Sequence, residues 1–381
     1  MNYINNINNI KNIINKLEKL KSLHDKNQLT NDDLISFVMS DKAFEDLEKL
    51  HIYLINKVNR IHKNETSEIN TDLCKKSLNL SECLESCSDA KRGGKIYFLN
   101  DKTAINYIFG DIHSDSYSLF KFLKKIDFTR RIQNTENLRL VFLGDYIDRG
   151  KAQFKVIETI LILKYIFPHN IFLLRGNHDG GEIISENEYK LCVKRNEDTT
   201  DDDYFVASVF NRLKELGKPL TLLKKYLKLF YGLCHAAVIK NGNETVLCVH
   251  GGIPRPRNDK YSHIESASDL WSNKKRDHLK GSIVHNMLWS DPAEDTSMQR
   301  DTRRFYFYES NFTEFAKIMS IDTVIRAHQA FENGYKEFFG GRLISVFSSG
   351  DTDNNNNETA YKNIIPCVLE LHSGDKELIR L

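Results

Sequence analysis

LRLVFLGDYIDRG, residues 138–150, passes from an apolar run directly into two aspartates and an arginine. The run over residues 138–143 is typical of a buried strand, so Asp145, Asp148 and Arg149 follow the end of that strand. Gly and Asp are common turn residues, and a polar turn alone would explain this stretch as well as a functional site would. The rest of the chain decides between these two interpretations.

The same pattern of a short apolar run followed by a polar cluster recurs along the chain. It occurs at residues 105–109 before Asp111, 171–174 before Asn177, 246–249 before His250, and 323–325 before His328. Helices are predicted over residues 117–126 and 154–167, strands over 343–347 and 364–371, and loops over the polar segments 197–203 and 351–357. Strands, polar loops and helices in this order indicate an α/β layered domain of mixed type.

The first 95 residues have a different pattern. Apolar residues follow one another at alternating spacings of four and three: Tyr3, Ile7, Ile10, Ile14 and Leu17. A second amphipathic stretch covers residues 44–61. We predict a helical N-terminal extension over residues 1–95 and a second domain over residues 96–381. Because the apolar stripe is too short to predict a coiled coil, we expect these helices to pack against the second domain, with self-association as the alternative.

The composition excludes several classes of protein. Charged residues make up 28% and hydrophobic residues 40% of the chain, which is usual for a soluble globular protein. The net charge of +2 gives no reason to expect nucleic acid or a membrane as partner. We find neither an apolar signal segment after Met1 nor a run long enough to span a membrane. The seven cysteines form no C-x-x-C pair, so a reducing, cytoplasmic location is expected.

The polar clusters after the strands predict a metal site. Loops at the carboxyl ends of strands in an α/β sheet meet at one edge. They would bring together six oxygen and nitrogen donors: Asp111, His113, Asp145, Asn177, His250 and His328. Imidazole and carboxylate ligands together suit Mn, Fe or Zn better than Mg or Ca. Six donors are too many for one tetrahedral zinc, and they indicate two ions that share a carboxylate.

Two such ions would activate a hydroxide and hold the oxygens of an in-line displacement at phosphorus. A phosphate group also requires cationic donors, and Arg149, Arg175 and Arg326 lie beside candidate ligands. A leaving alkoxide requires a proton. His178 is the natural proton donor and Asp148 the natural residue to orient it.

The ordered motifs resemble those of the phosphoprotein phosphatase family of serine/threonine phosphatases. The motifs are GDIHS (110–114), GDYIDRG (144–150), RGNHD (175–179), HGG (250–252), LWSDP (288–292) and IRAHQ (325–329). They cover roughly residues 104–350. The resemblance implies a calcineurin-like metallophosphoesterase fold, a β-sandwich flanked by helices, so that residues 96–381 would be the catalytic domain.

The resemblance also implies roles for individual residues. Asp111, His113 and Asp145 would hold the first metal, and Asp145 would bridge to a second metal held by Asn177, His250 and His328. His178 and Asp148 resemble the family's proton-donor pair. Arg149 resembles one phosphate clamp, and Arg303 or Arg304 the other. The sequence departs from the family at Ser114 (usually glycine), at Asp179 (usually glutamate) and at residues 348–352, where the SAPNY segment has lost its tyrosine.

These observations predict a metal-dependent hydrolase that removes phosphate from phosphoserine and phosphothreonine in proteins. A hydroxide activated by two divalent ions would act in a single in-line step, with manganese expected in vitro and iron or zinc as alternatives. A phosphohydrolase of the same fold acting on nucleotides such as diadenosine tetraphosphate is the second hypothesis, and a catalytically inactive scaffold is the third. The chain has no G-x-x-x-x-G-K-[ST] loop, and no cysteine is separated by five residues from a following arginine, as in the C-x-x-x-x-x-R motif of thiol-based phosphatases. P-loop and thiol-based mechanisms are therefore not indicated.

Overall fold

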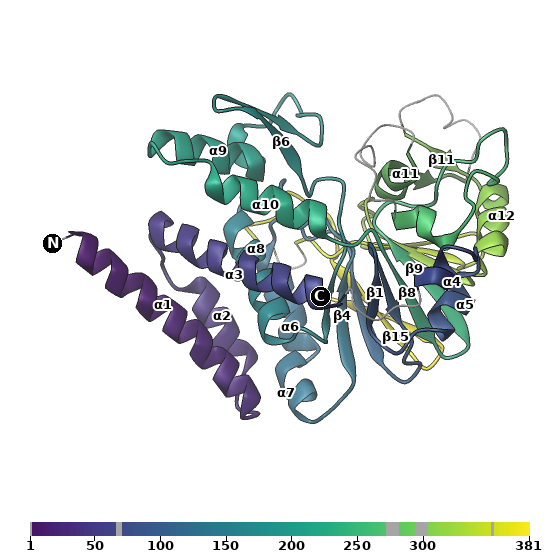
Figure 1. The fold of residues 1–381 in the computed structure, drawn as a ribbon, viewed down its shortest axis with the longest axis horizontal. Helices are drawn as coiled ribbons and strands as arrows, with labels where there is room; N and C mark the ends of the chain where they lie inside the picture. The colour runs from purple at the N-terminus through teal and green to yellow at the C-terminus, as the bar shows by residue number, and fades with distance from the viewer. Residues whose placement is uncertain (1, 66–70, 272–281, 295–303, 352–353) are drawn as a thin grey trace.

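The computed structural model describes residues 2–65, 71–271, 282–294, 304–351 and 354–381. Two sheets pack face to face, and helices cover both outer faces (Figure 1). The first sheet contains, in spatial order, β1 (Lys91–Gly93), β2 (Ile96–Leu99), β8 (Ala236–Asn241), β9 (Glu244–Val249), β12 (Thr323–Arg326), β14 (Leu343–Val346) and β13 (Tyr335–Phe338). The second contains β16 (Asp375–Arg380), β15 (Cys367–His372), β3 (Ile105–Phe109), β4 (Leu138–Phe142) and β5 (Ile171–Leu173). The predicted sandwich fold is confirmed.

The two-residue period of a strand explains the layering. Along β4 and the residue after it, Leu140 and Phe142 belong to the hydrophobic cluster beneath the helices, whereas Val141 and Leu143 belong to the cluster between the sheets. Successive side chains of a strand point to opposite faces, so both faces of this strand are buried. A third cluster lies beneath the helices on the outer face of the other sheet.

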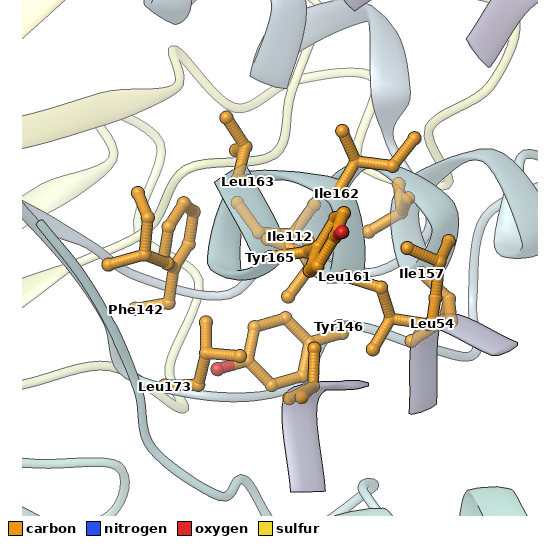
Figure 2. Close-up of a cluster of buried hydrophobic side chains, with 14 of the residues drawn as sticks. Leu54, Ile112, Phe142, Tyr146, Ile157, Leu161, Ile162, Leu163, Tyr165 and Leu173 are labelled. Atoms are coloured by element: carbon orange, nitrogen blue, oxygen red, sulfur yellow. The ribbon is translucent and has the colours of Figure 1, made fainter. Parts of the chain in front are cut away.

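The N-terminal helices pack against a helix that is buried on every side. Every residue of α8 (Gln153–Ile166) from Val156 onward is buried. The two helices predicted from the apolar stripe at residues 3–17 and from the amphipathic stretch 44–61 are present as α1 (Asn2–Asp25) and α3 (Phe44–Glu65). A further helix, α2 (Asn31–Met39), lies between them, and all three contact α8. Figure 2 shows Leu54 of α3 near Ile157 and Leu161 of α8. Of the predicted stripe, Ile10 and Leu17 join this core, while the side chains of Tyr3 and Ile7 lie outside the described residues.

Buried polar contacts add to this packing. The ring nitrogen Nε2 of His51 in α3 lies 3.3 Å from Glu158 Oε2 in α8, and Lys42 Nζ lies 3.0 Å from Glu158 Oε1. Further along, Glu65 at the end of α3 pairs with the fully buried Lys164. Because an unpaired buried charge is costly, each of these contacts favours a single position of α3 on α8. Packing of the N-terminal helices against the body is therefore observed within one chain.

The remaining part of the predicted extension lies on the opposite side of the sandwich. Helices α4 (Thr71–Cys74) and α5 (Leu80–Glu85) pack on the first sheet, and β1 pairs with β2. Figure 1 shows α4, α5 and α12 (Glu309–Met319) together on that side, away from α1–α3. The boundary at residue 95 stays a prediction.

The other elements lie around the sheet ends and over the faces. They are α6 (Ser116–Lys125), α7 (Phe128–Gln133), the hairpin β6 (Gly181–Ser185) and β7 (Glu188–Leu191), η1 (Asp201–Asp203), α9 (Phe205–Glu215), α10 (Thr221–Gly232), η2 (Ala267–Trp271), α11 (Ile283–Trp289), β10 (Asp291–Pro292) and β11 (Tyr306–Phe307). Part of the predicted loop 197–203 is thus the 3₁₀-helix η1. Among the described residues, no helix is both long and apolar enough to cross a membrane.

Candidate active site

Strand direction brings the predicted donors to one edge of the sandwich. Strands β3, β4 and β5 are parallel to one another, as are β9 and β12. The six candidate ligands follow the carboxyl ends of these five strands and are all buried except His328, which is mostly buried: Asp111, His113, Asp145, Asn177, His250 and His328. The structure therefore brings together every residue of the predicted metal set.

The turns that carry these residues have an unusual backbone. His113, Asp145, Asp148, Arg149 and His328 have φ values of 44°, 52°, 67°, 70° and 68°. Non-glycine residues adopt this left-handed conformation at a cost, and such residues cluster at functional sites where surrounding contacts enforce them. Ser114, with φ of 60°, also lies in this region, which explains why glycine is the usual residue there.

Asp145 lies between two histidines. Its Oδ2 is 3.5 Å from Nε2 of His113 and 3.4 Å from Nε2 of His250. Its Oδ1 accepts a hydrogen bond from the backbone N–H of His178 at 2.8 Å. Asp179 accepts the Asp145 N–H at 2.8 Å and the Gly176 N–H at 2.8 Å, so the aspartate found at this position fixes the turn. One carboxylate oxygen can thus serve two neighbouring ions.

The other donors surround the same point. Asp111 Oδ2 is 3.5 Å from His113 Nε2, and Asp111 Oδ1 accepts the backbone N–H of His328 at 2.9 Å. Asn177 Oδ1 is 2.7 Å from His250 Nε2. The ligand atoms of Asp145, His250 and His328 all lie within 4.8 Å of one another, as do those of Asp145, His113 and His178.

The hydrogen bonds of the histidines fit metal binding. Nδ1 of His113 lies 2.9 Å from the carbonyl oxygen of Ile147, and Nδ1 of His250 lies 3.1 Å from that of Leu143. A carbonyl only accepts, so both Nδ1 atoms donate, and Nε2 is the atom left to face the centre. Nε2 of His328 is buried without a hydrogen-bond partner in the part of the chain that the structure describes. A bound metal ion would provide a partner for this nitrogen atom.

The electrostatics reflect a dense group of charges. Burial alone would lower the pKa of His113, but Asp111 and Asp145 outweigh burial and raise it to about 9. Burial would raise the pKa of Asp145, yet the adjacent histidines hold it well below its usual value. The pKa of His328 is well below its ordinary value, because of burial and the nearby His250 and Arg326. His328 is therefore in the neutral form that a metal requires.

His178 and Asp148 form a hydrogen-bonded pair beside this cluster. Nδ1 of His178 lies 2.8 Å from Asp148 Oδ2, and the ring of His178 lies edge-on to that of His113 at 4.8 Å. His178 could in principle bind a metal with His113 and Asp145, but its Nδ1 is committed to Asp148. An imidazole oriented in this way by a carboxylate is suited to proton transfer.

The arginines have different surroundings. Nε of Arg149 is buried and has no hydrogen-bond partner among the described residues. Arg326 and Arg175 are fixed elsewhere: Arg326 binds Asp291 at 2.7 Å, and Arg175 donates to the Asp179 carbonyl at 3.0 Å. Both therefore act on the structure of the turns rather than as free phosphate donors. Arg304 also binds Asp291, at 2.7 Å.

Of the two candidates for the second phosphate clamp, only Arg304 lies among the described residues. Arg304 lies over the ring of Trp289 at 5.8 Å, and that ring in turn lies 5.8 Å from His328. Arg304 thus borders the site. Arg303 lies outside the described residues, and the choice between the two stays a prediction.

Tyr361 is a site residue that the sequence did not reveal. Its ring stacks on His113 at 5.5 Å and contacts Phe347 edge-on at 4.7 Å. Burial raises its pKa, with the Asp111 charge acting in the same direction. The preceding loop is held by Asn356, which donates to Asp115 Oδ1 at 2.8 Å, and by Glu358, which accepts from Ser116 Oγ at 2.6 Å. A tyrosine thus reaches this edge although the SAPNY segment lacks one.

Comparison with known protein families gives one match that covers more than half of the chain. The model for the calcineurin-like phosphoesterases matches residues 107–331, which include all six candidate ligands. The chain belongs to this family. This calcineurin-like phosphoesterase is 30% identical over 245 residues to the serine/threonine-protein phosphatase 4 catalytic subunit of Candida glabrata, a match that covers 64% of this chain and 68% of that protein.

Other relatives carry similar names. The phosphoesterase is 28% identical over 285 residues to serine/threonine-protein phosphatase BSL2 of Arabidopsis thaliana, covering 71% of this chain and 25% of that protein. It is 30% identical over 245 residues to a serine/threonine-protein phosphatase of Caenorhabditis elegans, covering 64% of this chain and 46% of that protein. The chain thus spans at most half the length of these two relatives. The resemblance to the phosphoprotein phosphatases is confirmed.

A solved structure supports the fold. The protein serine/threonine phosphatase of Saccharomyces cerevisiae, described as similar to human phosphatase PP5, superposes with a TM-score of 0.57 and 17% identity. The match covers 87% of this chain and 89% of that chain. It therefore includes most of the sandwich and its helices.

Proposed function

We propose that this phosphoesterase removes phosphate from phosphoserine and phosphothreonine in proteins by a single in-line displacement. The observation that carries the proposal is the position of Asp145 Oδ2 between His113 Nε2 and His250 Nε2, at 3.5 and 3.4 Å. This arrangement supports a dinuclear site with a bridging carboxylate. The names of the relatives support proteins as the substrate class.

The residues present fit two divalent ions. Asp111, His113 and Asp145 would hold one, and Asp145 with Asn177, His250 and His328 the other. When bound, manganese, iron or zinc would supply Lewis-acid stabilisation of the phosphoryl oxygens and a nucleophilic oxygen from water. The unpartnered Nε2 of buried His328 supports this assignment.

The chain supplies the other parts of the reaction. Arg149 would bind the phosphate oxygens, since its buried Nε has no partner among the residues that the structure describes. His178, held at Nδ1 by Asp148 at 2.8 Å, would give the proton on Nε2 to the leaving serine or threonine oxygen. The adjacent carboxylate keeps the ring oriented for this transfer.

The test compares substrates on the full chain. Manganese-loaded protein is assayed for phosphate release from phosphoserine, phosphothreonine and phosphotyrosine peptides and from diadenosine tetraphosphate. The proposal predicts the highest kcat/KM for the phosphoserine or phosphothreonine peptides. Higher kcat/KM for the dinucleotide would assign the nucleotide function instead, and turnover by none of them with metal bound would assign an inactive scaffold.

His178→Asn is the matched variant for the mechanism. It should lower kcat by roughly 10²- to 10⁴-fold for substrates with poor leaving groups while metal content stays normal. Equal losses for good and poor leaving groups would argue against proton donation by His178.

All seven cysteines are free thiols, which supports the further proposal of a reducing, cytoplasmic location.

A further inference from the structure

The end of the predicted loop 197–203 and the start of α9 contact the turn that carries the proton-donor partner Asp148. The backbone N–H of Phe205, the first residue of α9, donates to Asp148 Oδ1 at 2.8 Å. Two residues before Phe205, the carbonyl oxygen of Asp203 accepts the N–H of Arg149 at 3.0 Å. The carbonyl oxygen of Asp202 accepts from Gln153 Nε2 at 2.6 Å. Two of these contacts connect η1 and the start of α9 to the turn that carries Asp148 and Arg149, and the third connects η1 to the first residue of α8.

These contacts determine how Asp148 meets His178. Asp148 Oδ1 is taken by the Phe205 N–H, so Oδ2 is the oxygen that faces His178 Nδ1. Backbone N–H groups at the N-terminal end of a helix lack partners within the helix and are suitable donors to such a carboxylate. Asp148 and Arg149 are also in the left-handed conformation, at 67° and 70°, which persists only where surrounding contacts enforce it.

Asp201 holds this segment together. Its carboxylate accepts hydrogen bonds from Asn211 Nδ2 at 2.6 Å and from the hydroxyl of Tyr189 at 3.4 Å. It also forms an ion pair with Arg195. These three partners come from α9, from β7 and from the chain between β7 and η1. Asp201 thus fixes η1 to both neighbouring elements.

The neighbouring aspartates have other surroundings. Asp203 Oδ2 caps η1 by accepting from the backbone N–H of Thr200 at 2.7 Å. Asp202 has an exposed side chain and contacts Gln153 of α8 through its backbone carbonyl. Of the aspartates at 201–203, Asp201 is therefore the residue whose side chain joins η1 to its neighbouring elements. Asp202, whose side chain is exposed, provides the matched control substitution.

We propose that Asp201 is a positioning residue for proton donation: by fixing η1, it keeps Phe205 N–H on Asp148 and the Asp203 carbonyl on Arg149, and so keeps His178 aimed at the leaving group. The inference rests on the proposed function in one respect, namely that His178 donates the proton to a phosphate ester. It gives the acidic run over residues 201–203 a part in the reaction.

The test compares Asp201→Ala with Asp202→Ala in the full chain. Manganese-loaded proteins are assayed on aryl phosphates whose leaving groups range from good to poor. For Asp201→Ala we expect kcat to fall roughly tenfold on the poorest leaving group, a part of what a general acid contributes, and to change little on the best. Metal content should stay normal, and Asp202→Ala should behave as the wild type. Asp201→Asn keeps an acceptor for Asn211 and should give an intermediate loss.

A second measurement does not depend on turnover. In zinc-loaded protein without substrate, the proton between His178 Nδ1 and Asp148 should give a low-field NMR signal, identified by its loss in His178→Asn. The signal should weaken in Asp201→Ala and persist in Asp202→Ala. An unchanged signal, or equal losses of kcat for good and poor leaving groups, would overturn the inference. A preference of the wild type for dinucleotides would refute the proposed substrate and leave this comparison intact.

Discussion

Replacing Asp145 by asparagine tests the centre of the proposed site. Oδ2 of Asp145 lies 3.5 Å from His113 Nε2 and 3.4 Å from His250 Nε2, whereas Oδ1 accepts the His178 N–H at 2.8 Å. Asparagine can keep the acceptor at Oδ1 and places an uncharged NH₂ group at the position of Oδ2. The turn therefore keeps its backbone hydrogen bond, while the charge between the two histidines is lost.

The expected magnitude follows from the distances. At an effective dielectric constant of about 20, a carboxylate and a unit positive charge held about 3.5 Å apart by these ligands would attract each other by about 5 kcal/mol. Since about 1.4 kcal/mol changes a dissociation constant tenfold, losing even about 3 kcal/mol of this attraction weakens binding roughly a hundredfold. We expect at least this loss of affinity for both ions, because the same oxygen faces both histidines.

The assay measures bound manganese by mass spectrometry after equilibrium dialysis, together with phosphate release. Asp115→Asn is the matched control. Asp115 is also buried, but its carboxylate accepts from Ser118 N–H at 2.9 Å and Asn356 Nδ2 at 2.8 Å, so its loss should reduce stability and leave metal binding intact. Near-normal metal content and turnover in Asp145→Asn would refute the bridging assignment.

Three further predictions concern the backbone, the N-terminal helices and pH. Gly176→Ala should abolish activity, because its Cβ would lie 2.0 Å from Asp145 Oδ1; normal turnover would contradict the tight turn. Leu54→Ala removes a fully buried side chain and should lower the free energy of unfolding by about 2–5 kcal/mol in chemical denaturation, whereas exposed Lys49→Ala should change it little. His113, with a pKa of about 9, is protonated at neutral pH and must lose its proton to bind a metal. Calorimetry in two buffers should therefore detect proton release, and affinity should rise with pH up to about 9; affinity independent of pH would count against His113 as a ligand.

The elements with strong sequence periodicity could be predicted. The sequence predicts strand β3 over its observed residues and β4 to within one residue, because both are mostly apolar runs buried on two faces, interrupted only by Asn106 and Arg139. The six candidate ligands come together because each directly follows such a strand, so their positions are set by the sheet. Their role as ligands stays a prediction.

Contacts made by backbone groups and by loop packing could not be predicted. The Phe205 N–H that meets Asp148 has no sequence signature, because every residue except proline carries one. Tyr361 reaches His113 only because Asn356 and Glu358 hold a loop that reads as low-complexity sequence. Arg326 lies two residues before the candidate ligand His328, yet its guanidinium forms an ion pair with Asp291. Partners of this kind depend on long-range packing.

Packing of α1–α3 on α8, and of α3 also on α10, has a consequence for protein synthesis. Helices α1–α3 end at residue 65, whereas α8 begins at residue 153 and α10 at residue 221. At translation rates of about 5–20 residues per second, the apolar faces of the first three helices wait on the order of ten seconds for their partners. We expect the nascent chain to be most prone to aggregation, and most dependent on chaperones, during that interval. Helices α1–α3 are thus synthesised well before the helices against which they finally pack.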